Sequence, residues 1–362
     1  MSATATAAPV STQCKRAYAR YSLSCQQYET YRRTGYLAVK ALVPPEDVAE
    51  LIQHTEDLMQ GRLPEQAPPV DGQKLVLESP PKDLPPDEKA QFFLRIHMLH
   101  RKLELHERYM LHPRVLDVLE CLIGPDVLAL QTMLFLKPPG KPGQGWHQDT
   151  YYIPTHPDTL CGAWICMDDC DELNGAMWMA SGSGNEPVYP PANDVWFGNK
   201  NIGDIAYVNG VSDIDDAKND LTRVADKYPQ NLVAAKAGDV VFFNGHILHR
   251  SKKNHSTDRF RRSFVSHYCN ARSFTQWGAD TPKDNPHAAP FVDPQTGMTN
   301  VSHILARGDT HLPFAKPRFG TPCAALLSQP DRKKQSEFAA AAMGDMASGM
   351  MAAAPADPDV KH

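Results

Sequence analysis

The sequence lacks the features that mark several large classes of protein. No apolar run approaches the length that a membrane-spanning helix needs, and no internal repeat is visible. The net charge of −5 gives no reason to expect nucleic acid or an anionic membrane as a partner. The eight cysteines contain no C-x-x-C pair, and the spacing of Cys161, Cys166 and Cys170 fits no common zinc site. We therefore expect reduced thiols in a globular, cytoplasmic protein.

Acidic residues are also missing from the first 28 positions, which contain several basic residues and many Ala, Ser and Thr. We predict a disordered arm over residues 1–27, although a mitochondrial transit peptide has the same composition. At the other end, composition predicts a low-complexity tail over residues 326–362. Residues 28–325 are then expected to form a single domain, in which residues 183–236 are a lid-like insertion.

Helical patterns come first in this domain, and strand patterns follow. A short strand, a helix opened by Pro44 and Pro45, and a helix in "HPRVLDVLECLIGPD" precede strands in "VLALQTMLFL", "CGAWICMDD" and "GDVVFFNGHILHRS". Asn174-Gly175 is typical of a hairpin turn and stands before the apolar segment "AMWMA". This order favours an α+β fold, mainly β, in which helices flank a β-barrel or sandwich.

The lid-like insertion has one helical pattern of its own. The segment "SDIDDAKNDLTRVADKYP" predicts a helix over residues 212–229, with four residues facing inward: Ile214, Ala217, Leu221 and Val224. Four aromatic residues either line a substrate pocket or belong to the core: Trp178, Trp196, Tyr151 and Tyr152.

The stretch "GWHQDTYYIP" places a histidine two positions before an aspartate. In an extended chain residues i and i+2 point to the same side, so His147 and Asp149 present an imidazole and a carboxylate together. These are two of the three ligands in the two-histidine, one-carboxylate set that binds Fe(II). Among the fifteen histidines, the candidates for the third ligand are His246 and His249, which follow a strong strand. Five others are expected at the surface: His54, His97, His100, His106 and His112.

The segment "RFRRSFVSHY" predicts a strand with an arginine on its inward face. Four residues of this strand share that face: Arg261, Ser263, Val265 and His267. A guanidinium that points inward needs an anion. The anion is either a bound carboxylate, which arginine holds bidentately, or the partner in an ordinary salt bridge.

Two clusters of charge have ordinary explanations as well as functional ones. The acidic cluster is interpreted as a solvated turn, because no loop of properly spaced calcium ligands surrounds Asp168, Asp169, Asp171 and Glu172. The basic run either faces an anionic substrate or forms a solvated hairpin, which is the favoured interpretation for Arg250, Lys252, Lys253, Arg259 and Arg262.

Taken together, these motifs resemble a known family. "HQDTYYIP", "GAWICM", "NGAM", "AGDVVFF" and "HRSKKN…RFRRSFVSHY" are similar to the phytanoyl-CoA dioxygenase family of Fe(II)/2-oxoglutarate oxygenases. The resemblance covers residues 28–270, with poor alignment over the insertion 183–236. It implies a double-stranded β-helix, or jelly roll, and the cofactors Fe(II), 2-oxoglutarate and O2, with ascorbate as a candidate stimulant.

The resemblance also implies roles for particular residues. His147, Asp149 and His249 match the iron ligands, with His246 as the competing third ligand. The distal carboxylate of 2-oxoglutarate would be bound by Arg261, assisted by Ser251. Residues that match positions lining the cosubstrate pocket are Gln148, Met133 and Trp164. Arg95 is near the place of a further basic residue, one position out of alignment.

The chemistry implied is hydroxylation of an unactivated C–H bond in a small organic molecule, with succinate and CO2 as co-products. Because Asp149 is present, the site lacks the vacancy through which related halogenases admit chloride. Desaturation, epoxidation and cyclisation remain open at the same site, as does a non-catalytic protein that binds iron or 2-oxoglutarate. The sequence does not distinguish an anionic from a neutral substrate, or a monomer from a homodimer.

Overall fold

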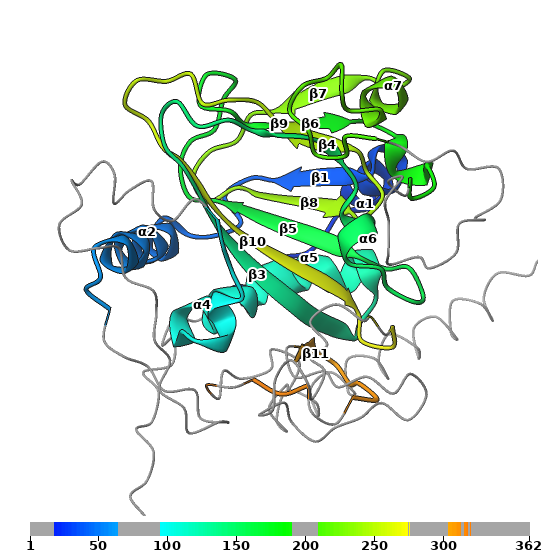
Figure 1. Cartoon of the computed structure of the whole chain (residues 1–362). Coiled ribbons are helices and arrows are strands. Elements are labelled where there is room, and N and C mark those ends of the chain that lie inside the picture. Colours follow the sequence, from blue (N-terminus) through cyan, green and yellow to red (C-terminus); the bar gives the residue numbers. More distant parts are fainter. Residues whose placement is uncertain are drawn as a thin grey trace, which may run out of the picture. The chain divides into compact units, whose positions relative to one another are not determined.

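The computed structural model describes residues 18–63, 95–189, 209–273 and 303–312, together with 275, 315–317 and 319. Within these residues, strands form two antiparallel sheets (Figure 1). The large sheet consists of β1 (Tyr36–Val39), β2 (Arg95–His97), β3 (Val127–Lys137), β5 (Cys161–Cys166), β8 (Val240–Asn244), β10 (Arg261–Asn270) and β11 (Ile304–Arg307). The small sheet consists of β4 (Gln144–His147), β6 (Met177–Ala180), β7 (Gln230–Val233) and β9 (His249–Ser251).

The strand order confirms the predicted jelly roll. The large sheet runs β1-β8-β5-β10-β3-β11, with β2 also paired to β3, and the small sheet runs β4-β9-β6-β7. Side chains from the facing sides of both sheets share one hydrophobic core, which includes Trp164, Phe243 and Val265 from the large sheet and Met177 and Met179 from the small sheet. The core therefore lies between the sheets, as in other two-layer β folds.

Helices cover the outer face of the large sheet. The described helices are α1 (Cys25–Thr34), α2 (Pro45–Met59), α4 (Glu104–Met110), α5 (Pro113–Ile123), α6 (Asp149–Tyr152) and α7 (Leu221–Ala225), with 3₁₀ turns η1 (Leu99–Arg101) and η2 (Ser183–Asn185). The alternate residues of β10 face α4: the Tyr268 hydroxyl donates to the Met110 carbonyl at 2.7 Å, and Phe264 packs on His106. None of the described helices is long and apolar enough to cross a membrane.

Two of the predicted elements are wrong. Asn174-Gly175 does not close a hairpin, because β5 belongs to the large sheet and β6 to the small sheet. Alternation along a strand predicts which residues face inward, but it does not say which sheet the strand joins. The helix predicted over 212–229 is reduced to α7, and Ile214 is 57% exposed rather than inward.

Short-range hydrogen bonds explain the missing turns of that helix. The Asp213 carboxylate accepts from the Asp215 amide at 2.9 Å, and the Asp215 carboxylate accepts from the Ala217 amide at 3.1 Å. Such side-chain bonds to the backbone compete with helical hydrogen bonds. The aspartates therefore hold this segment in turns.

The structure also bears on the predicted boundaries. The arm predicted over 1–27 overlaps the described chain: α1 begins at Cys25 behind a capping box at Ser24, and the Tyr18 hydroxyl donates to Asp47 at 2.7 Å. The insertion predicted over 183–236 contributes β7 to the small sheet. The tail over 326–362 lies outside the described residues.

Four of the five histidines predicted at the surface are buried. His54, His100, His106 and His112 are 9%, 0%, 1% and 2% exposed, whereas His97 is exposed. His112 contacts Asp47 and His100 contacts Thr132, but neither ring nitrogen of His106 has a hydrogen-bond partner among the residues that the structure describes. The apolar side of an imidazole fits a helix–sheet interface, and sequence polarity alone does not reveal this.

We expect this histidine cluster to make the fold acid-sensitive. Burial lowers the pKa of His54 from 6.5 to about 4 and lowers that of His106 further below its ordinary value. The folded state therefore favours the neutral form of these histidines, and stability is lost as the pH falls from about 6.5 to about 4. In urea unfolding, the free energy of unfolding should decrease by up to about 3 kcal/mol between pH 6.5 and pH 4, and this decrease should be smaller in His54→Leu. The exposed-residue control His255→Leu should keep the wild-type pH dependence; an equal change in all three would exclude His54 as its source.

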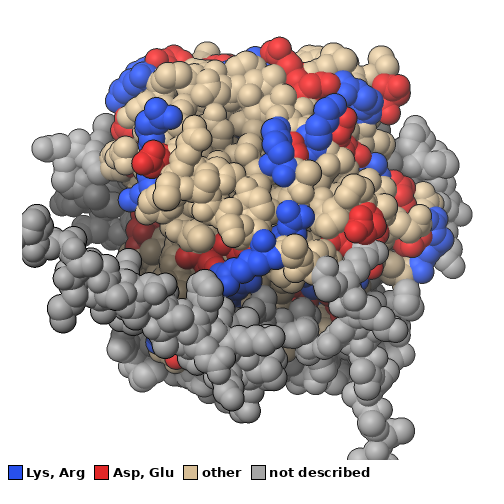
Figure 2. Space-filling view, turned by 180° about the vertical axis from the view of Figure 1, so that it is seen from behind, with Lys and Arg blue, Asp and Glu red and all other residues tan. Residues whose placement is uncertain are grey.

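The charged surface is mixed. On the face drawn in Figure 2, basic and acidic side chains of the described residues lie interspersed. In the two predicted charge clusters, basic side chains likewise lie next to acidic ones. Arg259 pairs with Asp171, Arg262 with Asp168, and Arg250 with Asp216. The Arg259–Asp171 pair is exposed, as in a solvated hairpin, whereas Arg262 and Arg250 are largely buried against their carboxylate partners.

Candidate active site

The fold brings together the two parts of the predicted iron-binding set. His147 ends β4 and His249 begins β9, and the two residues are direct partners in the antiparallel register. Asp149 opens α6, immediately after β4. One ligand atom from each residue lies within 4.8 Å of the others. Asp149 Oδ1 is 3.7 Å from Nε2 of each histidine, so the three side chains can share one metal ion.

The backbone fixes the orientation of both imidazoles. His147 Nδ1 bonds to the Gly145 carbonyl at 2.8 Å, and His249 Nδ1 bonds to the Ile247 carbonyl at 3.0 Å. A donor at Nδ1 leaves the lone pair on Nε2, which points to the shared centre. Gly145 is needed here because a Cβ atom would come within 1.9 Å of the Asp213 carbonyl oxygen. Two neutral imidazoles and one carboxylate are the donor set that suits ferrous iron.

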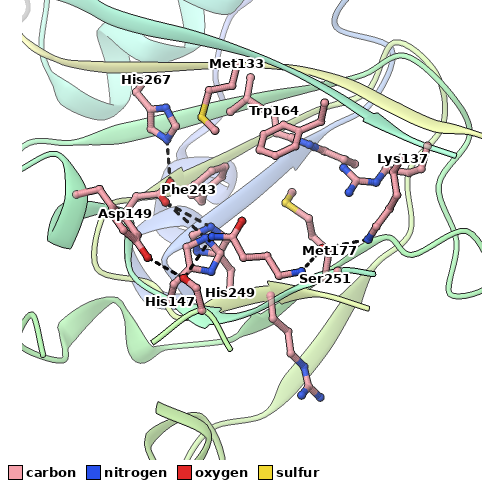
Figure 3. Close-up of a pocket in the computed structure, with 18 of the residues that line it drawn as sticks. Met133, Lys137, His147, Asp149, Trp164, Met177, Phe243, His249, Ser251 and His267 are labelled. Carbon is pink, nitrogen blue, oxygen red and sulfur yellow. Dashed lines mark hydrogen bonds and ion pairs between the residues drawn. The ribbon is translucent and has the colours of Figure 1, made fainter. Parts of the chain in front are cut away.

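Asp149 is held by a further residue, His267. Asp149 Oδ2 is 2.8 Å from His267 Nε2, and His267 Nδ1 is 2.9 Å from the Gln131 amide nitrogen. Figure 3 shows Asp149 between His267 and the two histidine ligands. Burial alone would raise the pKa of Asp149, but the adjacent His249 and His267 outweigh it and lower the pKa below its usual value. The carboxylate is therefore kept ionised, with one oxygen directed at the metal position.

A cavity of about 840 Å³ adjoins these residues. Met133, Trp164, Ser251 and Arg261, which sequence reasoning assigns to cosubstrate binding, all line it. Gln148 does not: it is buried, and its side-chain amide bonds to the backbone of Pro187, His246 and Tyr189. Of the four aromatic candidates, Tyr152 lines the cavity, whereas Trp178 packs under Lys252 and Trp196 lies outside the described residues. Arg95 lies in β2, but its side chain is not described.

Arg261 is a buried guanidinium without a carboxylate partner in the described part of the chain. Its residue exposure is 5%, and it donates one hydrogen bond, to the Ser263 hydroxyl at 3.2 Å. Nε has no partner, and burial lowers the pKa of the side chain. The salt-bridge alternative is therefore not observed. The orphaned guanidinium fits a carboxylate ligand that enters the cavity.

Sequence reasoning missed Lys137, which lies directly opposite Arg261 in the β3–β10 register. It is 5% exposed and lines the same cavity. Burial and the charge of Arg261 lower the pKa of Lys137 to about 6. A signal was present: Met133, Phe135 and Lys137 alternate along β3 and so share the cavity face. His267 had a similar signal, because it shares a face with Arg261.

His246, the competing third ligand, is engaged elsewhere. Its Nδ1 bonds to the Glu186 carbonyl at 2.7 Å, and its Nε2 bonds to the Asp158 carboxylate. Neither nitrogen belongs to the group around Asp149. The geometry therefore favours His249 as the third ligand.

Two facing antiparallel sheets that carry a two-histidine, one-carboxylate site define a class of mononuclear iron oxygenases with the jelly-roll fold. The sequence model of the phytanoyl-CoA dioxygenase (PhyH) family matches residues 31–263, and the chain belongs to this family. The resemblance inferred from the motifs is thereby confirmed. As a member, the protein is a dioxygenase whose cofactors are Fe(II), 2-oxoglutarate and O2.

Individual relatives agree with this assignment. Peroxisomal phytanoyl-CoA dioxygenase of Bos taurus is 30% identical over 254 residues, which are 69% of each chain. A probable alpha-ketoglutarate-dependent hypophosphite dioxygenase of Stutzerimonas stutzeri is 24% identical and covers 65% of this chain and 75% of its own. The crystal structure of the epimerase SnoN with Fe3+, alpha ketoglutarate and nogalamycin RO shares the fold, with a TM-score of 0.52, 18% identity and coverage of 78% and 98%.

Proposed function

We propose that the protein hydroxylates an unactivated C–H bond of a small organic molecule and releases succinate and CO2. The observation that carries the proposal is the orphaned Arg261 guanidinium, which lines the same cavity as the ligand set His147, Asp149 and His249. A metal ligand set alone also fits a structural ion. A buried guanidinium without a carboxylate partner, next to such a ligand set, fits the binding of a carboxylate cosubstrate by an oxygenase.

The residues have separate tasks in this reaction. His147, Asp149 and His249 would hold iron, which together with 2-oxoglutarate and O2 supplies the oxidation of the C–H bond. Arg261 would bind the distal carboxylate of 2-oxoglutarate. Trp164 packs on the Arg261 guanidinium, 5.5 Å from ring centroid to Cζ, and restricts its movement. A further task, keeping Asp149 turned to the metal, falls to His267.

The cavity gives the proposal its substrate class. A volume of about 840 Å³ lies in the range of small-molecule sites. Phe135, Ile153 and Val265 give the lining an apolar part, while Lys141 gives it positive charge; the charge of Arg250 is already paired with Asp216. We therefore favour an organic substrate with an apolar body, and an anionic group on it would face Lys141. The relatives, by their names, act on molecules as different as phytanoyl-CoA and hypophosphite, so the substrate is inferred from the cavity alone.

An anaerobic spectrum tests the cosubstrate assignment. Fe(II) and then 2-oxoglutarate are added to the protein without oxygen, and the visible absorption is recorded. We expect the weak charge-transfer band of 2-oxoglutarate chelated to ferrous iron, and we expect its loss in His147→Ala. Folded, iron-loaded protein without this band would contradict the proposal.

Product analysis then separates the remaining alternatives. With a substrate and isotopically labelled O2, hydroxylation and epoxidation each place one labelled oxygen in the product, whereas desaturation and cyclisation place none. Loss of a carbon–carbon double bond of the substrate then distinguishes epoxidation from hydroxylation. A charge-transfer band without succinate formation across a broad substrate screen would instead favour a non-catalytic binding protein.

A further inference from the structure

Lys137 and Arg261 form a pair of buried basic side chains in the cavity, here called the cation pair. The residues are partners in the β3–β10 register, both line the cavity, and each is 5% exposed. Like charges directly opposite each other on one face of a sheet are destabilising. Since neither side chain forms an ion pair within the described residues, an anion between them would remove this repulsion.

The hydrogen bonds of Lys137 would not compensate a positive charge on its amine. Its Nζ donates to the Ser251 hydroxyl at 3.2 Å, to the Gly175 carbonyl at 3.4 Å and to the Lys252 carbonyl. All three acceptors are neutral. Figure 3 shows Lys137 directed at Ser251, on the side of the cavity away from His267 and Asp149. Lys137 therefore lies at the end of the cavity farther from Asp149.

The charged and titratable groups that face Lys137 come from two elements. Arg261 of β10 disfavours its protonation, and Cys170, in the connection after β5, has a smaller opposing effect. Together with burial, they place the pKa of Lys137 at about 6. In the ligand-free protein the amine is therefore mostly neutral at pH 7.5, as a buried lysine beside a second cation should be.

We propose that Lys137 is a second ligand for the distal carboxylate of 2-oxoglutarate and that it takes up one proton from solvent when 2-oxoglutarate binds. The inference rests on the proposed role of Arg261. A carboxylate accepts hydrogen bonds at both oxygens, so Arg261 binds from one strand while Lys137 and Ser251 bind from the other side. The bound anion favours the ammonium form, so affinity for 2-oxoglutarate decreases as the pH rises above the pKa of free Lys137.

Calorimetry measures the proton directly. 2-Oxoglutarate is titrated into Fe(II)-loaded protein without oxygen at pH 7.5, in HEPES and in Tris, which differ in protonation enthalpy. We expect the wild-type protein to take up nearly one proton per 2-oxoglutarate bound. Lys137→Met should take up none and should bind with a Kd raised by roughly 10- to 100-fold. Lys253→Met removes an exposed lysine from the adjacent segment and should match the wild type.

If Lys137 had a purely structural role, the melting temperature of Lys137→Met without 2-oxoglutarate would fall. We expect that it does not fall, because methionine fills the space without a buried amine. Wild-type binding without proton uptake would overturn the inference and leave the proposed function standing. An unchanged Kd in Lys137→Met would do the same. Failure of the wild type to bind 2-oxoglutarate or to show the charge-transfer band would instead contradict the proposed function.

Discussion

Replacing His249 by alanine is expected to abolish iron binding, whereas replacing His246 should leave it intact. His249 Nε2 faces Asp149 Oδ1 at 3.7 Å, and its loss leaves two ligands for the metal. Both nitrogens of His246 instead bond to Glu186 and Asp158. Loss of a supporting hydrogen bond alone lowers metal affinity by roughly 10- to 100-fold, so loss of a ligand should exceed this.

Iron content after anaerobic reconstitution, together with the charge-transfer band, measures this difference. His246→Ala is a matched control, because it removes the same side chain three positions away. It should bind iron as the wild type does, and its stability should change little, since the pair with Asp158 is partly exposed. Iron retained by His249→Ala and lost by His246→Ala would show that His246 is the ligand.

Arg261→Met should weaken 2-oxoglutarate binding by roughly 100-fold and leave iron in place. The variant removes a charge-assisted, bidentate donor to a carboxylate, which is among the strongest polar contacts available. It should not lower the free energy of unfolding, because the buried guanidinium has no carboxylate partner among the described residues and its Nε makes no hydrogen bond there. The Kd for 2-oxoglutarate is obtained by titrating the charge-transfer band, with iron measured separately.

The neighbouring arginine offers the control for this variant. Arg262 points to the other side of β10 and pairs with Asp168 and Glu56. Arg262→Met should therefore lower stability while the Kd for 2-oxoglutarate stays at the wild-type value. If Arg261→Met bound 2-oxoglutarate normally, the carboxylate would have to be held elsewhere.

The candidate site was predicted largely from local spacing. His147 and Asp149 are two residues apart, and alternation along β10 puts Arg261 on the inward face, so local geometry decides both. His249 could be chosen over His246 only by resemblance. The structure adds the physical reason, which is the direct register between β4 and β9. Register depends on contacts far apart in the sequence, so no local pattern contains it.

What the sequence did not reveal was decided by tertiary contacts. Alternation along a strand predicts that Lys137 and His267 face the cavity, but it does not identify the residues on other strands, Arg261 and Asp149, from which they gain their roles. The buried histidines differ from the prediction because polarity alone indicates exposure, whereas the apolar side of an imidazole packs in a helix–sheet interface. The helix over 212–229 failed because turns at Asp213 and Asp215 compete locally with the helical pattern.

The metal ligands and the cation pair are carried by different sheets. His147 and His249 lie on neighbouring strands of the small sheet, while Lys137 and Arg261 lie on neighbouring strands of the large one. In the proposed cosubstrate site, the span that 2-oxoglutarate must bridge is therefore a distance between the two sheets, which the core side chains of Met177 and Phe243 help to set. Discrimination between 2-oxoglutarate and its shorter or longer homologues is then a property of interlayer packing. A substitution in that packing could change the cosubstrate preference without altering any group that binds it.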